Sequence, residues 1–221
     1  MSIITFFIDF ILHLDVHLST IIQNYGVWTY LLLFLIIFVE TGLVFIPFLP
    51  GDSLLFAAGA FAAIGSLDVK LLLLLLCFAA IMGDTLNYHI GKYAGNALMR
   101  KANGRWLKKE YFESTEKFYQ KHGNKTIVIA RFLPIVRTFA PFMAGVGKMR
   151  YGKFVSYNIL GGILWVFLFV LGGYFFVNIP IVKENFTLAI LAIIFLSLLP
   201  LILKFIKHRK EMKTKQELEI K

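Results

Sequence analysis

The chain has 221 residues; 58% of them are hydrophobic, 16% are charged, and the mean hydropathy is +0.75. Soluble chains are about 45–50% apolar and about 25% charged, so this composition excludes a disordered tail, a coiled coil and an ordinary cytosolic enzyme. The single cysteine excludes a disulfide framework and a cysteine-based zinc cluster. What remains is a membrane protein, and the net charge of +10 has to be explained by where the charges lie.

Residues 1–25 predict an amphipathic helix lying at the membrane interface. One helical stripe is apolar, and the opposite stripe is polar, formed by Asp9, His13, His17, Thr20 and Asn24. The segment has no basic start and no small-residue cleavage site, which argues against a cleaved signal peptide. A helix packed against the outside of a helical bundle fits the same pattern.

Residues 27–64 contain only two charged side chains, and their length allows two apolar helices, since a spanning helix needs about 20 apolar residues. Proline and glycine residues predict a break between these helices, at Pro47, Pro50 and Gly51. The sequence predicts about four transmembrane helices, which cover residues 27–45, 69–93, 154–182 and 185–203. They form a single membrane domain, residues 26–206.

Lysine and arginine gather in three places: residues 100–125, residues 148–153 and the tail from Lys204. The positive-inside rule puts these clusters, and with them the basic tail 207–221, in the cytoplasm. The N-terminus is also expected there. The positive charge is therefore explained by membrane topology, and no nucleic-acid partner is expected.

Two segments have to return to the side from which they enter the membrane. Residues 126–147 connect two cytoplasmic clusters and are too short for two full spans, so we expect a re-entrant hairpin, broken at Pro134, Pro141 and Gly145. The same count predicts a hairpin over 46–64 that enters from outside. The stretch 45–51 matches 139–145 at four of seven positions, which indicates an inverted repeat of the kind that places a transport site near the midplane.

Five ionisable side chains lie in these apolar surroundings: Glu40, Asp52, Asp84, Arg131 and Arg137. Each costs roughly 2.5–3.5 kcal/mol at the centre of an inserted helix, which favours a functional role. The two arginines present forked donors suited to a phosphate group, and the first two acids could carry protons. Asp84 lies on a polar stripe with Asn87 and Tyr88, which we expect to support the site. In the alternative interpretation, these charges only pair and hold the hairpins together.

The motifs that would indicate catalysis are incomplete. Gly51–Leu54 spells the signature of the GDSL-type esterases, but the Asp-x-x-His pair that activates their serine is absent. A phosphate-loop motif and metal-ligand spacings are absent as well. The sequence therefore predicts a protein that is not an enzyme and needs neither a cofactor nor a metal.

Long motifs in this chain resemble the DedA family of bacterial inner-membrane proteins, which shares its domain with eukaryotic lipid scramblases. They are E-T-G from Glu40, P-F-L-P-G-D-S from Pro47, G-D-T-L-N-Y from Gly83 and R-F-L-P-I-V-R-T-F-A-P-F from Arg131. The resemblance covers roughly residues 1–205. It implies paired re-entrant hairpins, a need for the acids and arginines at positions 40, 52, 131 and 137, and dependence on the proton motive force. It also implies return of undecaprenyl phosphate across the membrane, with phosphatidylethanolamine distribution and cation homeostasis as other roles in the family.

We therefore expect a proton-coupled flippase of the bacterial cytoplasmic membrane that moves a lipid phosphate headgroup, with undecaprenyl phosphate as the expected substrate. Arg131 and Arg137 would bind the phosphate, and Glu40 and Asp52 would exchange protons. Three alternatives stay open: a proton-coupled small-ion transporter, a phospholipid scramblase and a non-transporting scaffold. The sequence leaves homo-oligomer formation open.

Overall fold

The structure, a computed structural model, describes residues 24–43, 51–100, 109–180 and 182. Every regular element among these residues is a helix, so the all-helical prediction is confirmed for the described part of the chain. Most of the predicted interfacial helix (1–25), the predicted span 185–203, the tail 207–221, and the two prolines Pro47 and Pro50 lie outside the described residues.

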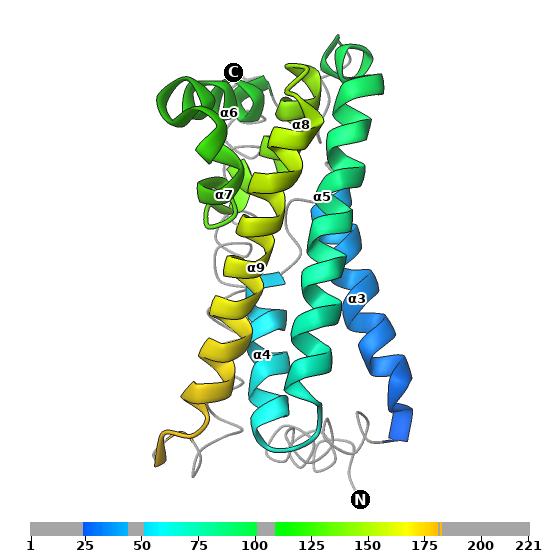
Figure 1. The fold of residues 1–221 in the computed structure, drawn as a ribbon, viewed down its shortest axis with the longest axis vertical. Helices are drawn as coiled ribbons and strands as arrows, with labels where there is room; N and C mark the ends of the chain where they lie inside the picture. The colour runs from blue at the N-terminus through cyan, green and yellow to red at the C-terminus, as the bar shows by residue number, and fades with distance from the viewer. Residues whose placement is uncertain (1–23, 44–50, 101–108, 181, 183–221) are drawn as a thin grey trace, which may run out of the picture.

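Two long helices form the centre of the bundle, α5 (Val69–Arg100) and α9 (Tyr151–Phe176) (Figure 1). Their apolar stretches contain 27 residues (Val69–Gly95) and 26 residues (Tyr151–Phe176), with mean hydropathies of 2.1 and 2.2. At about 1.5 Å per residue each reaches roughly 40 Å, which exceeds the roughly 30 Å hydrocarbon core of a bilayer. Leucines on both helices point outward, as a lipid-facing surface requires. By length and composition, both helices could therefore cross a membrane.

Shorter apolar helices precede α5. Helix α3 (Val27–Gly42) ends and α4 (Gly51–Ala63) begins where the sequence predicts a break. Helix α4 has 13 residues and is about 20 Å long, which is too short to cross the bilayer core by itself.

The chain between the long helices forms α6 (Lys109–His122), a short 3-10 turn (Gly123–Lys125), α7 (Thr126–Ala130) and α8 (Pro134–Val146). Helices α7 and α8 are separated by residues 131–133. Pro134 is the first residue of α8, a position where its missing N–H costs nothing. This part of the chain lies at the end of the bundle opposite to α4 (Figure 1).

Two predicted hairpin breakers do not break the backbone. Pro141 and Gly145 both lie inside α8, so these two predictions are wrong. Pro141 removes one backbone hydrogen bond, the one that the carbonyl oxygen of Arg137 would accept. Side chains of neighbouring helices donate to two other carbonyl groups of α8, at Thr138 and Ala140, and so tie this helix to α5 and α6.

Helices from the two halves of the chain pack together through reciprocal glycine contacts. A Cβ atom on Gly59 of α4 would overlap the carbonyl group of Val170 on α9, and one on Gly173 of α9 would overlap that of Phe56. The same exchange joins α8 to α5, through the pairs Gly145–Tyr88 and Gly91–Phe142. In each of the four helices, the glycine lies three positions after the residue whose carbonyl group faces the other helix's glycine. The absence of side chains at these glycines lets the helix backbones touch.

These backbone contacts relate the two halves of the chain in a different register from the one that the sequence repeat suggested. The match aligned Gly51 with Gly145, but Gly51 begins α4 whereas Gly145 is the next-to-last residue of α8. That alignment is therefore wrong as a structural equivalence. The residues that make equivalent contacts are Phe56–Gly59 and Phe142–Gly145, which share the pattern F-x-A-G.

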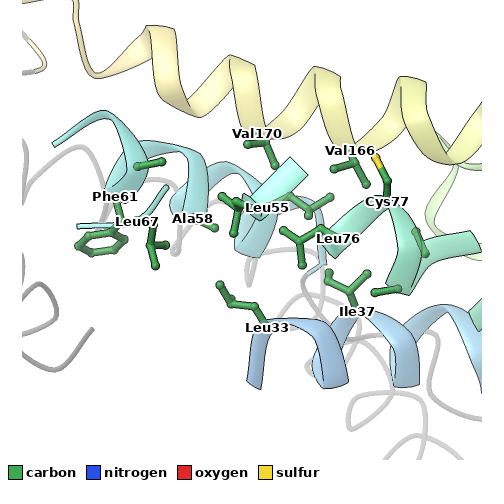
Figure 2. Close-up of a cluster of buried hydrophobic side chains, with 14 of the residues drawn as sticks. Leu33, Ile37, Leu55, Ala58, Phe61, Leu67, Leu76, Cys77, Val166 and Val170 are labelled. Carbon is green, nitrogen blue, oxygen red and sulfur yellow. The ribbon is translucent and has the colours of Figure 1, made fainter. Parts of the chain in front are cut away.

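Apolar side chains form two buried clusters, one toward each end of the bundle. The first lies between α3, α4, α5 and α9 and includes Leu55, Leu76 and Val166 (Figure 2). The second surrounds Tyr88 and Phe154. Along α5 and α9, the residues between the two clusters include the polar side chains described next.

Candidate functional site

The candidate site lies where the two buried clusters meet, near the middle of the apolar stretches of α5 and α9. All five predicted ionisable residues are described by the structure, and each takes part in an ion pair there. They form two groups, one around each arginine.

Arg131, which follows α7, is bound between α5 and α9. Its Nη2 atom donates to Asp84 Oδ2 at 2.5 Å and to Asn158 Oδ1 at 2.6 Å. The Asn158 amide is itself oriented, because its Nδ2 donates to the carbonyl oxygen of Ile81 at 3.0 Å. A Cβ atom on Gly161 would lie 3.1 Å from the arginine's Cδ and Nε, so the glycine makes room for this side chain. The Arg131 and Asp84 side chains are only 4% and 6% exposed, which makes this a buried ion pair.

Arg137, on α8, joins two carboxylates. Its Nη2 binds Glu40 Oε1, at the end of α3, and its Nη1 donates to Asp52 Oδ1 at 2.7 Å, in the first turn of α4. Glu40 Oε1 also accepts the backbone N–H of Gly51 at 3.2 Å. A Cβ on Gly51 would overlap the Glu40 carboxylate, so only glycine permits this contact. Both acids thus lie at the N-terminus of α4, where the helix dipole favours negative charge.

Trp165 on α9 connects the two groups. Its indole Nε1 donates to Asp52 Oδ1 at 2.8 Å, and its ring lies 5.2 Å from the Cζ of Arg137 and 5.9 Å from that of Arg131. A guanidinium within about 6 Å of a tryptophan ring is stabilised by the electron density on its face. The buried Trp165 side chain therefore contacts Asp52 and both arginines.

Asn87 and Tyr88, which were predicted to support the site together with Asp84, have packing contacts. Asn87 donates to the carbonyl oxygens of Thr41 at 3.1 Å and Thr138 at 2.9 Å, and so ties α5 to α3 and α8. Tyr88 donates to the carbonyl oxygen of Met149 at 2.5 Å, and its ring belongs to the second buried cluster. Neither contacts Asp84 through a described hydrogen bond.

Helix α6 is fixed to the α8 segment that carries Arg137. The Tyr119 hydroxyl donates to the carbonyl oxygen of Ala140 at 2.9 Å. Burial, with a smaller contribution from the carboxylate of Asp84, raises the pKa of Tyr119 well above its ordinary value. The phenol therefore stays protonated and remains a hydrogen-bond donor.

A small cavity of about 10 Å³ lies among these side chains, lined by Glu40, Thr41, Asp84, Arg131, Arg137, Thr138 and Trp165. A cavity of this size has room for about one water molecule, so it is too small for an organic headgroup unless the ion pairs separate. Two buried polar atoms in its lining, Glu40 Oε2 and Arg131 Nε, have no hydrogen-bond partner among the described residues. The cavity is thus lined by charged groups that retain unused hydrogen-bonding capacity.

The sequence analysis missed two members of the site, Asn158 and Trp165. Asn158 is the first amide in the uncharged stretch 154–182, and a lone amide in a spanning segment is a signal in itself. Trp165 lies in the interior of a spanning helix, whereas tryptophan in membrane proteins is usual at the interface. It also lies three residues after a pair of glycines. Both signals were available in the sequence.

Residues 49–175 match the VTT domain. The chain is also 52% identical to Protein DedA of Escherichia coli over 212 residues, which cover 95% of this chain and 97% of that protein. The chain belongs to the DedA family. Within this family it is 44% identical over 187 residues to an uncharacterized membrane protein of Mycobacterium leprae, covering 84% of each chain. It is 34% identical over 177 residues to the inner membrane protein YghB of Escherichia coli, covering 80% of this chain and 78% of that one.

No solved structure matches the chain significantly. The names of the Mycobacterium leprae relative and of YghB describe membrane proteins, and none of the three names states an enzymatic activity. Family membership and the two long apolar helices together identify this chain as a DedA-family membrane protein.

Proposed function

We propose that this protein is a flippase that moves a lipid phosphate headgroup, with undecaprenyl phosphate as the proposed substrate, across the bacterial cytoplasmic membrane. The observation that carries the proposal is the pair of buried arginines held by three carboxylates around one cavity. Intramembrane charges on this scale are costly, and they are typical of substrate and ion pathways.

The chemistry of the arginines supports a phosphate ligand. A guanidinium donates two parallel hydrogen bonds to a phosphate as readily as to a carboxylate, because both anions offer paired oxygens. In the structure the carboxylates of Glu40, Asp52 and Asp84 hold these donors. Transport would then exchange carboxylate oxygens for phosphate oxygens, with the cavity widening as the ion pairs separate. Only the headgroup needs this polar path, since the lipid tail can stay in the bilayer.

Re-entrant hairpins would give the site access from both sides. In this proposal α4 belongs to the hairpin that enters from outside, and α7 with α8 forms the hairpin that enters from the cytoplasm. The short length of α4, the break at residues 131–133 and the reciprocal packing of α4 on α9 and α8 on α5 support this arrangement. Both termini would lie in the cytoplasm, as the basic clusters favour.

Protons would drive the exchange. Protonating Asp52 or Glu40 removes the negative charge that competes for Arg137, and so frees the arginine for the phosphate. Release of the proton on the other side would restore the ion pair and expel the headgroup. The cycle therefore couples proton movement to headgroup movement without any covalent step.

Translocation of a polyprenyl phosphate in proteoliposomes tests the proposal. Wild type and Arg137→Ala, at matched folded yield, are compared with and without a pH gradient, and phosphatidylethanolamine serves as a second substrate. Wild type should translocate the polyprenyl phosphate faster with the gradient, and the variant should not. Wild-type translocation of phosphatidylethanolamine alone would contradict the phosphate headgroup and favour a phospholipid scramblase.

A proton-coupled small-ion transporter is the second candidate, favoured by the small size of the cavity. It predicts proton or cation flux in vesicles without any translocated lipid. Ion flux by the wild type without lipid translocation, and retained in Arg137→Ala, would support that candidate.

A further inference from the structure

At the N-terminus of α4, an indole N–H from α9 lies beside an arginine as a second donor to an anion. The Trp165 indole N–H and Arg137 Nη1 converge on one oxygen, Asp52 Oδ1, at 2.8 and 2.7 Å. Indole nitrogen can only donate a hydrogen bond, and a buried indole requires an acceptor. An anion at this point receives two hydrogen bonds and the favourable field of the α4 N-terminus.

Asp52 is the exposed member of the charge network. Its side chain is 39% exposed, whereas those of Arg137 and Glu40 are 10% and 2% exposed. Glu40 and Asp52 each accept two hydrogen bonds, Glu40 from Arg137 and Gly51 and Asp52 from Arg137 and Trp165, so the two acids differ in exposure. Among the carboxylates around Arg137, Asp52 is therefore the one that can move into solvent.

Resting on the proposed function, we infer that Asp52 and the phosphate of the substrate compete for one anion site made by Arg137 Nη1 and the Trp165 indole N–H. In the structure the carboxylate occupies this site. When Asp52 moves aside, a phosphate oxygen takes its place between the same two donors, while Glu40 keeps its contact with Arg137 Nη2. Trp165 is thus a substrate-binding residue, and Asp52 is an internal competitor that keeps the site closed.

Competition has a measurable consequence. A ligand binds with an apparent affinity reduced by the fraction of molecules whose site is free. Asp52→Ala should therefore bind a phosphate monoester about tenfold more tightly if the carboxylate occupies the site nine-tenths of the time. Trp165→Phe keeps an aromatic ring beside the arginines but lacks the donor, which weakens binding of both the phosphate and its competitor Asp52. The two effects partly offset each other while Asp52 is present, so the full loss, about tenfold for a hydrogen bond to a charged group, is expected in the Asp52→Ala background.

The experiment is calorimetric titration of the full-length protein in detergent with geranyl phosphate, using monodisperse preparations. Four proteins are compared: wild type, Asp52→Ala, Trp165→Phe and the double variant. Trp28→Phe serves as the matched control, because Trp28 is exposed on α3 and should bind like wild type. Geraniol tests whether the phosphate is needed, and inorganic phosphate tests whether the lipid portion contributes.

The double variant shows whether Trp165 binds the phosphate itself or only positions Asp52. If Trp165 binds the phosphate, Trp165→Phe weakens binding about tenfold in the Asp52→Ala background. If Trp165 acts only by holding Asp52, its substitution has no effect in that background, and the inference is wrong. A Trp165→Phe protein that does not fold would be replaced by Trp165→His, which restores a ring donor and should bind more tightly than Trp165→Leu.

The remaining outcomes separate this inference from the proposed function. Equal binding by Asp52→Ala and the double variant overturns the inference and leaves the flippase proposal intact. Equal affinities for inorganic and geranyl phosphate support the anion site but contradict a lipid substrate. Failure of wild type and Asp52→Ala to bind either phosphate overturns both.

Discussion

Two aspartates offer a matched test of how this site is built. Asp84 and Asp52 each form an ion pair with an arginine, at 2.5 and 2.7 Å, but the Asp84 side chain is 6% exposed and the Asp52 side chain 39%. The same substitution, to alanine, should therefore have very different effects on folding stability.

The expected costs follow from burial. Asp84→Ala leaves the guanidinium of Arg131 buried with the neutral Asn158 as its described acceptor, and breaking a buried ion pair costs about 3–5 kcal/mol. Asp52→Ala removes a partly exposed pair worth about 0–1 kcal/mol and a helix N-terminal charge worth about 0.3–1 kcal/mol. Arg137 keeps its contact with Glu40, but the indole N–H of Trp165 loses its acceptor at a position that is partly open to solvent, so we expect a total loss of about 1–2 kcal/mol.

Thermal unfolding in detergent measures the difference. For a chain of this length 1 kcal/mol corresponds to roughly 2–4 °C in Tm, so Asp84→Ala should unfold roughly 6–20 °C below wild type and Asp52→Ala only roughly 2–8 °C below it. Equal losses for the two variants would refute the assignment of Asp84 to a fixed buried pair and Asp52 to an exchangeable one.

Three further predictions concern the scaffold. Gly173→Ala should lower the stability of the protein by about 1–3 kcal/mol, because its Cβ overlaps the facing backbone. Gly172→Ala meets only ordinary contacts and should raise the stability by up to about 1 kcal/mol. Comparing the Tm values of the two variants checks the reciprocal packing. Asn158→Ala should cost about 1–3 kcal/mol, since it removes the neutral acceptor of Arg131, and equal Tm values for variant and wild type would contradict that role. The buried thiol of Cys77 should react with a maleimide only when the protein unfolds, and rapid labelling of folded protein would contradict the packing between α5 and α9.

The helices could largely be predicted from the sequence because their signals are local. Apolar runs of sufficient length predict α5 and α9, and glycine and proline predict the break between α3 and α4. The interior of α8 could not be predicted in this way. Proline normally ends a helix, but Pro141 lies inside α8, which side chains of α5 and α6, remote in sequence, hold in place through hydrogen bonds to its carbonyl groups.

The candidate site was predictable as a set of residues but not as a set of pairs. An ionisable side chain in an apolar run is visible in the sequence, whereas its partner depends on how helices distant along the chain meet. Asp84 was expected to support the site, yet it forms a direct ion pair with Arg131. Likewise, the sequence repeat was aligned at Gly51, and only the backbone contacts of Gly59 and Gly145 show which residues are equivalent.

The central claim is that Arg137 binds a lipid phosphate rather than only holding α3, α4 and α8 together. Arg137→Lys tests it most directly, because lysine keeps the positive charge beside Glu40 and Asp52 but lacks the forked donors. The measurement is translocation of a polyprenyl phosphate in proteoliposomes, with wild type and variant reconstituted at equal folded yield. We predict that Arg137→Lys stays folded and loses at least about tenfold of the transport rate. Wild-type transport by a folded Arg137→Lys protein would contradict the claim and leave the charge network with a structural role.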